Sequence, residues 1–171
     1  MRLFIAINFS DTMRNELLAI LDKLRSESKH GRFTEPENLH LTLAFLGECN
    51  NGQAAAAKDA MDTINFEPFQ ISIGNIGRFK RDGGDIWWAG ILASKPLINL
   101  QKELIGKLTA EGFIPDKRKY KPHITLGRKV VTNTIPWQAT TFCETVTCID
   151  LTKSERVNGK LTYIPMHKKI L

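Results

Sequence analysis

A four-residue pattern, His-x-Thr-Leu, occurs twice in this chain and constrains what it can fold into more than any other feature. The first copy lies in "NLHLTLAF" (38–45) and the second in "KPHITLGR" (121–128). Each copy sits in an apolar run typical of a β-strand, where a histidine and a threonine gain nothing from being buried. The repetition therefore indicates a purpose for these polar side chains other than packing.

Side chains alternate across a strand, so each motif should present its histidine and threonine on one face. In the second copy we expect His123 and Thr125 to point one way and Ile124 and Leu126 the other. In the first copy the expected polar face holds His40, Thr42 and Ala44, and the expected core face holds Leu41, Leu43 and Phe45.

The spacing around the two motifs indicates an internal duplication. Ile5 precedes His40 by 40 − 5 = 35 residues, and Trp88 precedes His123 by 123 − 88 = 35 residues. In each half an apolar strand leads to a leucine-faced helix, a loop and then the motif, which is a repeated supersecondary unit. Two copies related by an approximate two-fold axis would bring both histidines into one cleft.

Local signals predict the remaining elements. Strands are expected at 2–9, 69–79 and 85–92, with a turn at 82–84. A first helix should start at Ser10 or Asp11, a second should cover 53–64, and a third should run from Pro96 to near Gly112. We expect a loop containing Gly31 and Pro36, and a tail of two strands, 142–154 and 160–171, joined by a type I′ turn at Asn158-Gly159.

The length of 171 residues fits one domain, and 42% hydrophobic residues suffice for a core. The net charge of +6 and the pI near 9.3 favour an anionic partner, although they also suit plain solubility. Three cysteines without CxxC spacing indicate neither a disulfide framework nor a zinc knuckle. We expect a cytoplasmic protein with no membrane segment, because no signal peptide and no run of about 18 apolar residues is found.

Two histidines in one cleft suit acid-base chemistry at phosphorus. An imidazole has an unperturbed pKa of about 6.5, so one ring can accept a proton while the other donates one near neutral pH. Displacement at phosphorus places the attacking and leaving oxygens roughly in line, on opposite sides. The hydroxyls of Thr42 and Thr125 could donate to the remaining phosphate oxygens. Four side chains from two strands would then surround one phosphate.

Other uses of the histidines are weaker. A zinc site normally needs three or four protein ligands, and no third ligand is patterned near the motifs, although Asp116 and Glu37 could be recruited by folding. A Ser-His-Asp hydrolase lacks its G-x-S-x-G elbow here. We therefore expect no metal and no cofactor.

Arg128 does not fit the alternation of its strand. Five positions after His123 it should face the core, unless it lies beyond the strand end or Gly127 marks a bulge. A bulge would turn the guanidinium toward an anion, where it could bind two phosphate oxygens.

Basic and aromatic residues near the motifs could bind a chain that carries phosphates and bases. Those that could track phosphates are Arg32, Arg78, Lys80, Arg81, Lys119 and Lys121, and those that could stack bases are Phe33, Phe79, Trp87 and Tyr120. A solvated basic surface with core aromatics is the competing interpretation.

With these motifs the chain resembles the 2H phosphoesterases, and within them the 2′-5′ RNA ligase-like RNA 2′,3′-cyclic phosphodiesterases. The resemblance rests on "RLFIAI" (2–7), "ENLHLTLAFLGE" (37–48), "KPHITLGR" (121–128) and "LTKSERVNGKLTY" (151–163). It implies an α+β fold, a bilobed pseudo-two-fold duplication within one domain (1–171), with antiparallel sheets lining a central cleft and helices outside. It also implies hydrolysis of a terminal RNA or nucleoside 2′,3′-cyclic phosphate to a 2′-phosphate without metal or ATP, by a monomer.

The same resemblance assigns roles to residues. His123 would accept a proton from water and His40 would protonate the departing ribose O3′, with Thr42, Thr125 and Arg128 at the phosphate. Arg32, Phe33 and Lys121 would bind the substrate, although relatives often carry tryptophan where this chain has Phe33. Two alternatives stay open: ATP-independent 2′-5′ ligation in the same site, and a non-catalytic RNA- or nucleotide-binding module.

Overall fold

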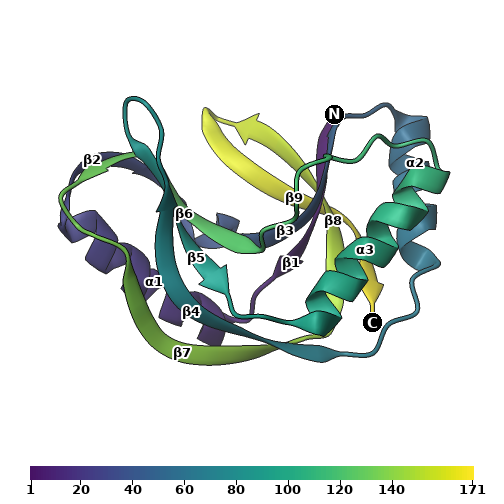
Figure 1. Cartoon of the computed structure of the whole chain (residues 1–171). Coiled ribbons are helices and arrows are strands. Elements are labelled where there is room, and N and C mark those ends of the chain that lie inside the picture. The colour runs from purple at the N-terminus through teal and green to yellow at the C-terminus, as the bar shows by residue number, and fades with distance from the viewer.

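The computed structural model describes all 171 residues, which form nine β-strands, three α-helices and one 3₁₀ turn (Figure 1). The strands are β1 (Arg2–Asn8), β2 (Ser28–Phe33), β3 (His40–Glu48), β4 (Phe69–Phe79), β5 (Asp85–Ile91), β6 (His123–Thr132), β7 (Trp137–Val146), β8 (Cys148–Val157) and β9 (Lys160–Ile170). The helices are α1 (Asp11–Ser26), α2 (Asn51–Asp62) and α3 (Lys95–Ala110), and the 3₁₀ turn is η1 (Pro36–Asn38).

The strands form two antiparallel sheets with matching order, which confirms the α+β class and the pseudo-two-fold arrangement. One sheet has the order β3-β1-β8-β9, and the other has the order β2-β6-β5-β4-β7. The series β3-β1-β8-β9 corresponds to β6-β5-β4-β7, and β2 is an additional edge strand. In each half the motif strand pairs with the strand that precedes a helix, so the repeated unit has the same strand pairing in both halves.

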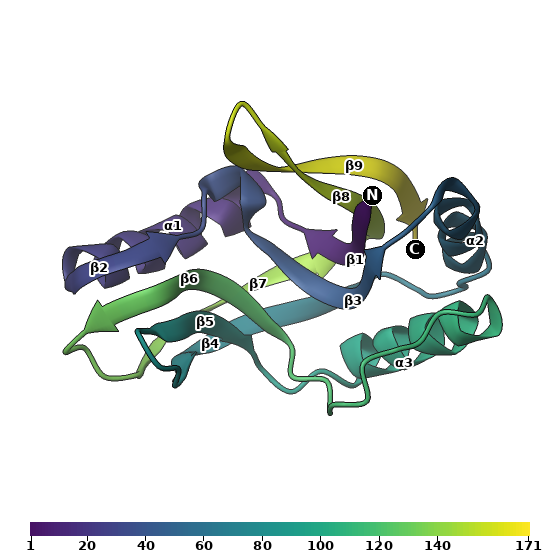
Figure 2. The same ribbon diagram turned by 90° about the horizontal axis from the view of Figure 1, so that it is seen from above.

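The helices cover the sheets at opposite ends of the molecule. Figure 2 shows α1 at one end and α2 beside α3 at the other. Helix α1 follows β1 of the four-stranded sheet but packs against β2 and β7 of the five-stranded sheet, whereas α3 packs against α2, β3 and β4. The helices fall short of the length and apolarity that a membrane-spanning helix needs.

The leucine periodicity of α1 and α3 correctly predicts their buried faces. The hydroxyl of Ser10 accepts from the Met13 backbone N–H at 3.2 Å, so Ser10 rather than Asp11 is the N-cap of α1. The buried residues are Met13, Leu17, Leu21 and Leu24 of α1 and Leu97, Leu100, Leu104 and Leu108 of α3. Leu18 and Ile20, whose spacing from Leu17, Leu21 and Leu24 predicts a place on the same apolar face of α1, are only partly buried.

Two predicted segments were wrong. Residues 28–33 form the edge strand β2 instead of a loop, and their polar sequence hides it because an edge strand packs little apolar surface. Residues 142–154 are not one strand, because the chain leaves β7 at Val146 and enters β8 at Cys148 in the other sheet. The turn between β8 and β9 was correct: φ is +51° at Asn158 and +79° at Gly159, as type I′ requires.

Both motif strands carry a β-bulge directly after the threonine. In β3, Thr42 pairs with Ala6 and Ala44 with Ile5, so Leu43 is an extra residue. Beyond it the alternation is reversed: Ala44 is buried and Phe45 is 67% exposed. The expectation that Ala44 shares a face with His40, and Phe45 with the core, is therefore wrong.

The bulge in β6 lies at the equivalent place. Thr125 pairs with Trp88 and Gly127 with Trp87, so two residues of β6, Leu126 and Gly127, lie opposite one residue of β5. Arg128, the next residue, is exposed instead of facing the core. Because 45 + 83 = 128 and 40 + 83 = 123, Phe45 and Arg128 occupy corresponding positions of the two halves.

The loop between β4 and β5 contains a glycine, Gly84, whose backbone conformation and surroundings exclude a side chain. Gly84 has φ +122°, and a Cβ there would lie 2.5 Å from the backbone carbon of Lys129, beside Arg128. We expect Gly84→Ala to lower the free energy of unfolding by about 2 kcal/mol or more, because both the dihedral and the space exclude a side chain. Gly106→Ala in α3, where a Cβ meets nothing within 4 Å, should raise it by about 0.5–1 kcal/mol. Urea denaturation of the two variants measures both changes, and equal changes in the free energy of unfolding would contradict this prediction.

Candidate active site

The two motif strands meet where the sheets approach each other. Strands β3 and β6 are in contact although they belong to different sheets. His40 is the first residue of β3 and His123 the first residue of β6, so each motif lies at the start of its strand. Both imidazoles are partly exposed.

The two imidazoles are held by the same local hydrogen bond. Nδ1 of His40 lies 2.7 Å from the carbonyl oxygen of Asn38, and Nδ1 of His123 lies 2.6 Å from that of Lys121. A carbonyl can only accept, so Nδ1 carries the proton in both rings. In the neutral form each Nε2 therefore has a free lone pair.

The Nε2 atoms differ in what surrounds them. Nε2 of His40 lies 3.0 Å from Oγ1 of Thr42, whose hydroxyl donates to the neutral ring. Nε2 of His123 has no hydrogen-bond partner in the protein, because Thr125 uses only its backbone carbonyl, which accepts from the Thr34 hydroxyl at 2.8 Å. The site is thus symmetric in backbone but not in hydrogen bonding.

Burial lowers the pKa of both histidines below 6.5. For His40 the largest cause is desolvation, since the rings of Phe4 and Tyr163 lie with their centroids 4.9 and 5.1 Å from the imidazole. Desolvation is also the largest cause for His123, where the Phe79 ring centroid lies 5.3 Å away. The carbonyl hydrogen bonds oppose these shifts without reversing them.

Charge repulsion within the site adds to this shift. The positive charge of Arg128 lowers the pKa of His40 and of His123, and a charge on His123 lowers that of His40. The three groups therefore act on one another electrostatically within one site. Both rings favour the neutral form in the free protein, and an anion bound between them would favour protonation.

The other residues that the sequence predicts to bind the substrate lie around the two histidines. Arg128 is exposed and forms no ion pair with a carboxylate, and Arg32 lies directly opposite it on β2. Phe33 is half-buried against Gly127, with the Arg25 guanidinium 5.3 Å from its ring centroid. The side chain of Lys121 is exposed, while its carbonyl holds His123.

A cavity of about 700 Å³ opens beside the motifs. It is bounded by Thr42 and His123, by the exposed ring of Phe45, and by the loop that precedes β6. Its basic residues are Arg81, Arg118, Lys119 and Lys121, and its other aromatics are Phe79, Phe113 and Tyr120. Arg118 is engaged by Asp116 at 2.5 Å. The cavity thus has an apolar lining and a basic rim.

Several residues reach the site through contacts that the sequence did not predict. The Tyr120 hydroxyl donates to the carbonyl of Thr42 at 2.9 Å and so connects the two halves. Buried Asn38 donates from Nδ2 to the Leu161 carbonyl at 2.9 Å, which connects η1 to β9. Tyr163 and Phe45 reach the site only through β-pairing and the bulge. Their positions depend on tertiary contacts that spacing does not reveal.

Possible metal ligands are not gathered anywhere in the fold. No group of three or more His, Cys, Asp or Glu side chains lies in a position to hold one ion. Asp116 pairs with Arg118, and Glu37 pairs with Lys160 at 2.6 Å, so neither joins the histidines.

Comparison with known proteins identifies the family. A family model described as LigT like Phosphoesterase matches residues 7–88. An RNA 2′,3′-cyclic phosphodiesterase of Archaeoglobus fulgidus is 36% identical over 129 residues, which cover 75% of this chain and 72% of that protein. The chain belongs to the LigT-like phosphoesterase family.

Relatives and structures over the full length support this membership. The RNA 2′,3′-cyclic phosphodiesterase of Escherichia coli is 28% identical over 169 residues, 98% of this LigT-like chain and 94% of that protein. The crystal structure of E. coli LigT complexed with 3′-AMP matches with a TM-score of 0.88 at 29% identity, and it covers 99% of this chain and 97% of that one. The pseudo-symmetric two-sheet fold of the family is therefore shared.

The electrostatics of the site predict the titration of its histidines. We expect both to titrate below 6.5 by NMR, and Arg128→Ala should raise both pKa values because it removes a repelling charge. Since the unfolded chain binds these protons more readily, the free energy of unfolding should also fall as the pH drops from about 6.5 through the folded-state values. Arg32→Ala, which removes the arginine opposite Arg128, is the matched control and should leave both pKa values unchanged. Unchanged pKa values in Arg128→Ala would show that the guanidinium points away from the pair.

Proposed function

We propose that this LigT-like phosphoesterase hydrolyses the 2′,3′-cyclic phosphate at an RNA end to a 2′-phosphate, with its two histidines as general acid and general base. The observation that carries the proposal is the paired imidazoles, each held through Nδ1 by a backbone carbonyl two residues earlier. The names of the relatives support the substrate class. So does the Arg128 charge, which acts on both rings and suits an anionic reaction centre.

The difference between the Nε2 atoms supports a direction for the reaction. His123 has an unengaged Nε2 lone pair, which suits it to accept a proton from water as the water oxygen attacks phosphorus. The new P–O bond forms opposite the ribose O3′, as in-line displacement requires. His123 is accordingly the base in this proposal.

His40 would then be the acid. Its pKa lies low in the free protein, so the proposal requires the bound phosphate to raise it by supplying a negative charge. Protonated Nε2 would give its proton to O3′ as the P–O3′ bond breaks, leaving a 2′-phosphate and a 3′-hydroxyl. One water is consumed, and the proton taken by His123 replaces the one given by His40.

The remaining polar groups would hold the phosphate. The Thr42 hydroxyl, released from His40 when that ring is protonated, and the Thr125 hydroxyl would donate to non-bridging oxygens. Arg128 would bind the same oxygens and offset the charge that builds up on them. The residues of one motif cannot surround the phosphate alone, so we propose that residues 1–171 act as one two-lobed domain.

The cavity beside the motifs would take the terminal nucleoside. Its volume and apolar lining are those of a small-molecule site, and the exposed Phe45 ring could stack on a base. Lys121 at its rim, with Arg32 and Phe33 beside Arg128, would contact the rest of the RNA. Because all the proposed groups come from one chain, we propose that the protein acts as a monomer. We also propose that it needs no metal and acts in the cytoplasm.

Removal of either imidazole tests this function. With an RNA ending in a 2′,3′-cyclic phosphate, we expect His40→Ala and His123→Ala each to lower kcat by about 10²- to 10⁴-fold, while His30→Ala, an exposed histidine outside the motifs, leaves it unchanged. Product analysis should find the phosphate on the 2′ oxygen, and EDTA should not affect the rate. Full activity in His40→Ala, a 3′-phosphate product, or loss of activity with EDTA and recovery with zinc would each contradict part of the proposal.

A substrate with a better leaving group tests the direction. If O3′ is replaced by sulfur, the departing thiolate needs no proton from an acid. We therefore expect the 3′-thio cyclic substrate to restore most of the activity lost in His40→Ala and little of that lost in His123→Ala. The opposite pattern would exchange the two roles.

A further inference from the structure

An exposed arginine, Arg2, lies on the cleft side of the four-stranded sheet, away from the cavity. Arg2, Ser154 and Tyr163 form one row across β1, β8 and β9, so their side chains share a face. The register between β1 and β8 runs without a shift from Arg2 to Ala6, which places Phe4 on that same face. The row therefore continues the surface that contains His40.

Aromatic contacts show that Tyr163, at one end of this row, lies beside His40. The Tyr163 ring centroid lies 5.1 Å from the His40 imidazole and 4.9 Å from the Phe4 ring. Phe4 in turn lies 4.9 Å from His40. Tyr163 is thus a direct neighbour of the proposed acid, and Arg2 lies in the same row, two strands away on β1.

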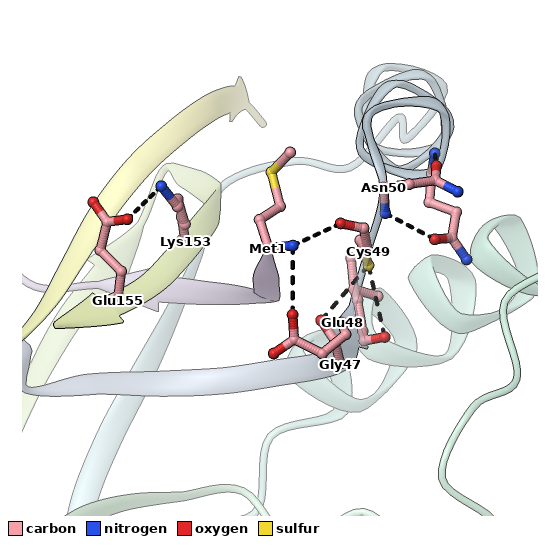
Figure 3. A network of polar contacts seen from close by, with 9 residues as sticks. Met1, Gly47, Glu48, Cys49, Asn50, Lys153 and Glu155 are labelled. Carbon is pink, nitrogen blue, oxygen red and sulfur yellow. Dashed lines mark hydrogen bonds and ion pairs between the residues drawn. The ribbon is translucent and has the colours of Figure 1, made fainter.

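Arg2 has no partner within the protein. The carboxylates around it are already engaged: Glu48 lies 3.4 Å from the Met1 amino group, and Glu155 pairs with Lys153 (Figure 3). The Arg2 side chain is exposed and takes part in no hydrogen bond or ion pair. A guanidinium with five donors and no acceptor fits an external anion.

The hydroxyl of Tyr163 is similarly free, and Tyr163 lies in the row that contains Arg2. It makes no hydrogen bond in the protein. Burial raises the pKa of Tyr163, and the charges of Arg128 and of Arg2 oppose that shift.

We propose that Arg2 and Tyr163 form a second anion subsite, which binds a phosphodiester of the RNA chain on the 5′ side of the terminal nucleotide. This inference rests on the proposed function, because the cyclic phosphate then occupies the histidines. The other backbone anions of such an RNA are the phosphodiesters toward its 5′ end. Neither Arg2 nor Tyr163 lines the cavity proposed for the nucleoside, so base and backbone leave the reaction centre on different sides.

The subsite makes the enzyme prefer an RNA chain over a single nucleotide. We compare kcat/KM for a short oligoribonucleotide ending in a 2′,3′-cyclic phosphate with that for the nucleoside 2′,3′-cyclic phosphate. Arg2→Ala should lower the ratio of the two values about tenfold, and Tyr163→Phe, which keeps the ring against His40, about threefold. Arg2→Lys, which keeps the charge, should retain most of the preference. Lys102→Ala, an exposed cation on α3, is the control for net charge and should not change the ratio.

Binding provides a readout that does not need turnover. For a fluorescent oligoribonucleotide ending in a 2′-phosphate, the slope of log affinity against log salt concentration should become shallower by about 0.7 in Arg2→Ala and stay unchanged in Lys102→Ala. If the wild-type protein binds this RNA with that difference but turns over neither cyclic phosphate, the proposed function fails and the subsite stands. A substrate ratio and a salt slope that are unchanged in Arg2→Ala, or equal losses on both substrates, would overturn the subsite.

Discussion

The site depends on one constraint on each motif strand. Part of the strand must pack against the core, and yet side chains from both odd and even positions must face the cleft. A regular strand cannot do this, because residues an odd number of positions apart point to opposite faces. The bulges at Leu43–Ala44 and at Leu126–Gly127 resolve the conflict by adding a residue directly after the threonine. The histidine and threonine before the bulge and the residue after it then share one surface, while Leu41 and Ile124 stay in the core.

The duplication supplies a symmetric frame, and single residues make its two halves chemically different. The bulge exposes an aromatic ring at Phe45 in one half and a guanidinium at Arg128 in the other. The Thr42 hydroxyl occupies Nε2 of His40, whereas Nε2 of His123 is free. Two equal imidazoles would have no reason to take opposite roles, so these differences are what would assign acid and base.

Desolvation and anion binding act on the histidines in opposite directions. Phe4 and Tyr163 around His40, and Phe79 beside His123, disfavour the charged rings in the free protein. Arg128 adds repulsion but offers an attractive contact to phosphate. In such a site the imidazoles favour the neutral form until an anion binds. The anion that binds Arg128 then favours protonation of a neighbouring imidazole. The basic surface around the site, from Arg2 to Lys121, adds to this preference for anions.

The sequence by itself determined the two motifs, the duplication, the helices and the β8–β9 turn. These features follow from local rules: strand alternation, leucine spacing at the helical period, Ser10 as a cap, and Asn158-Gly159 at positive φ. It also indicated a bulge near Gly127. Only the tertiary structure decided that a second bulge exposes Phe45, that residues 28–33 form an edge strand, and that Tyr120, Asn38 and Tyr163 reach the motifs from distant segments. These outcomes depend on which strands pair and in what register, and a strand's own sequence does not encode its partner.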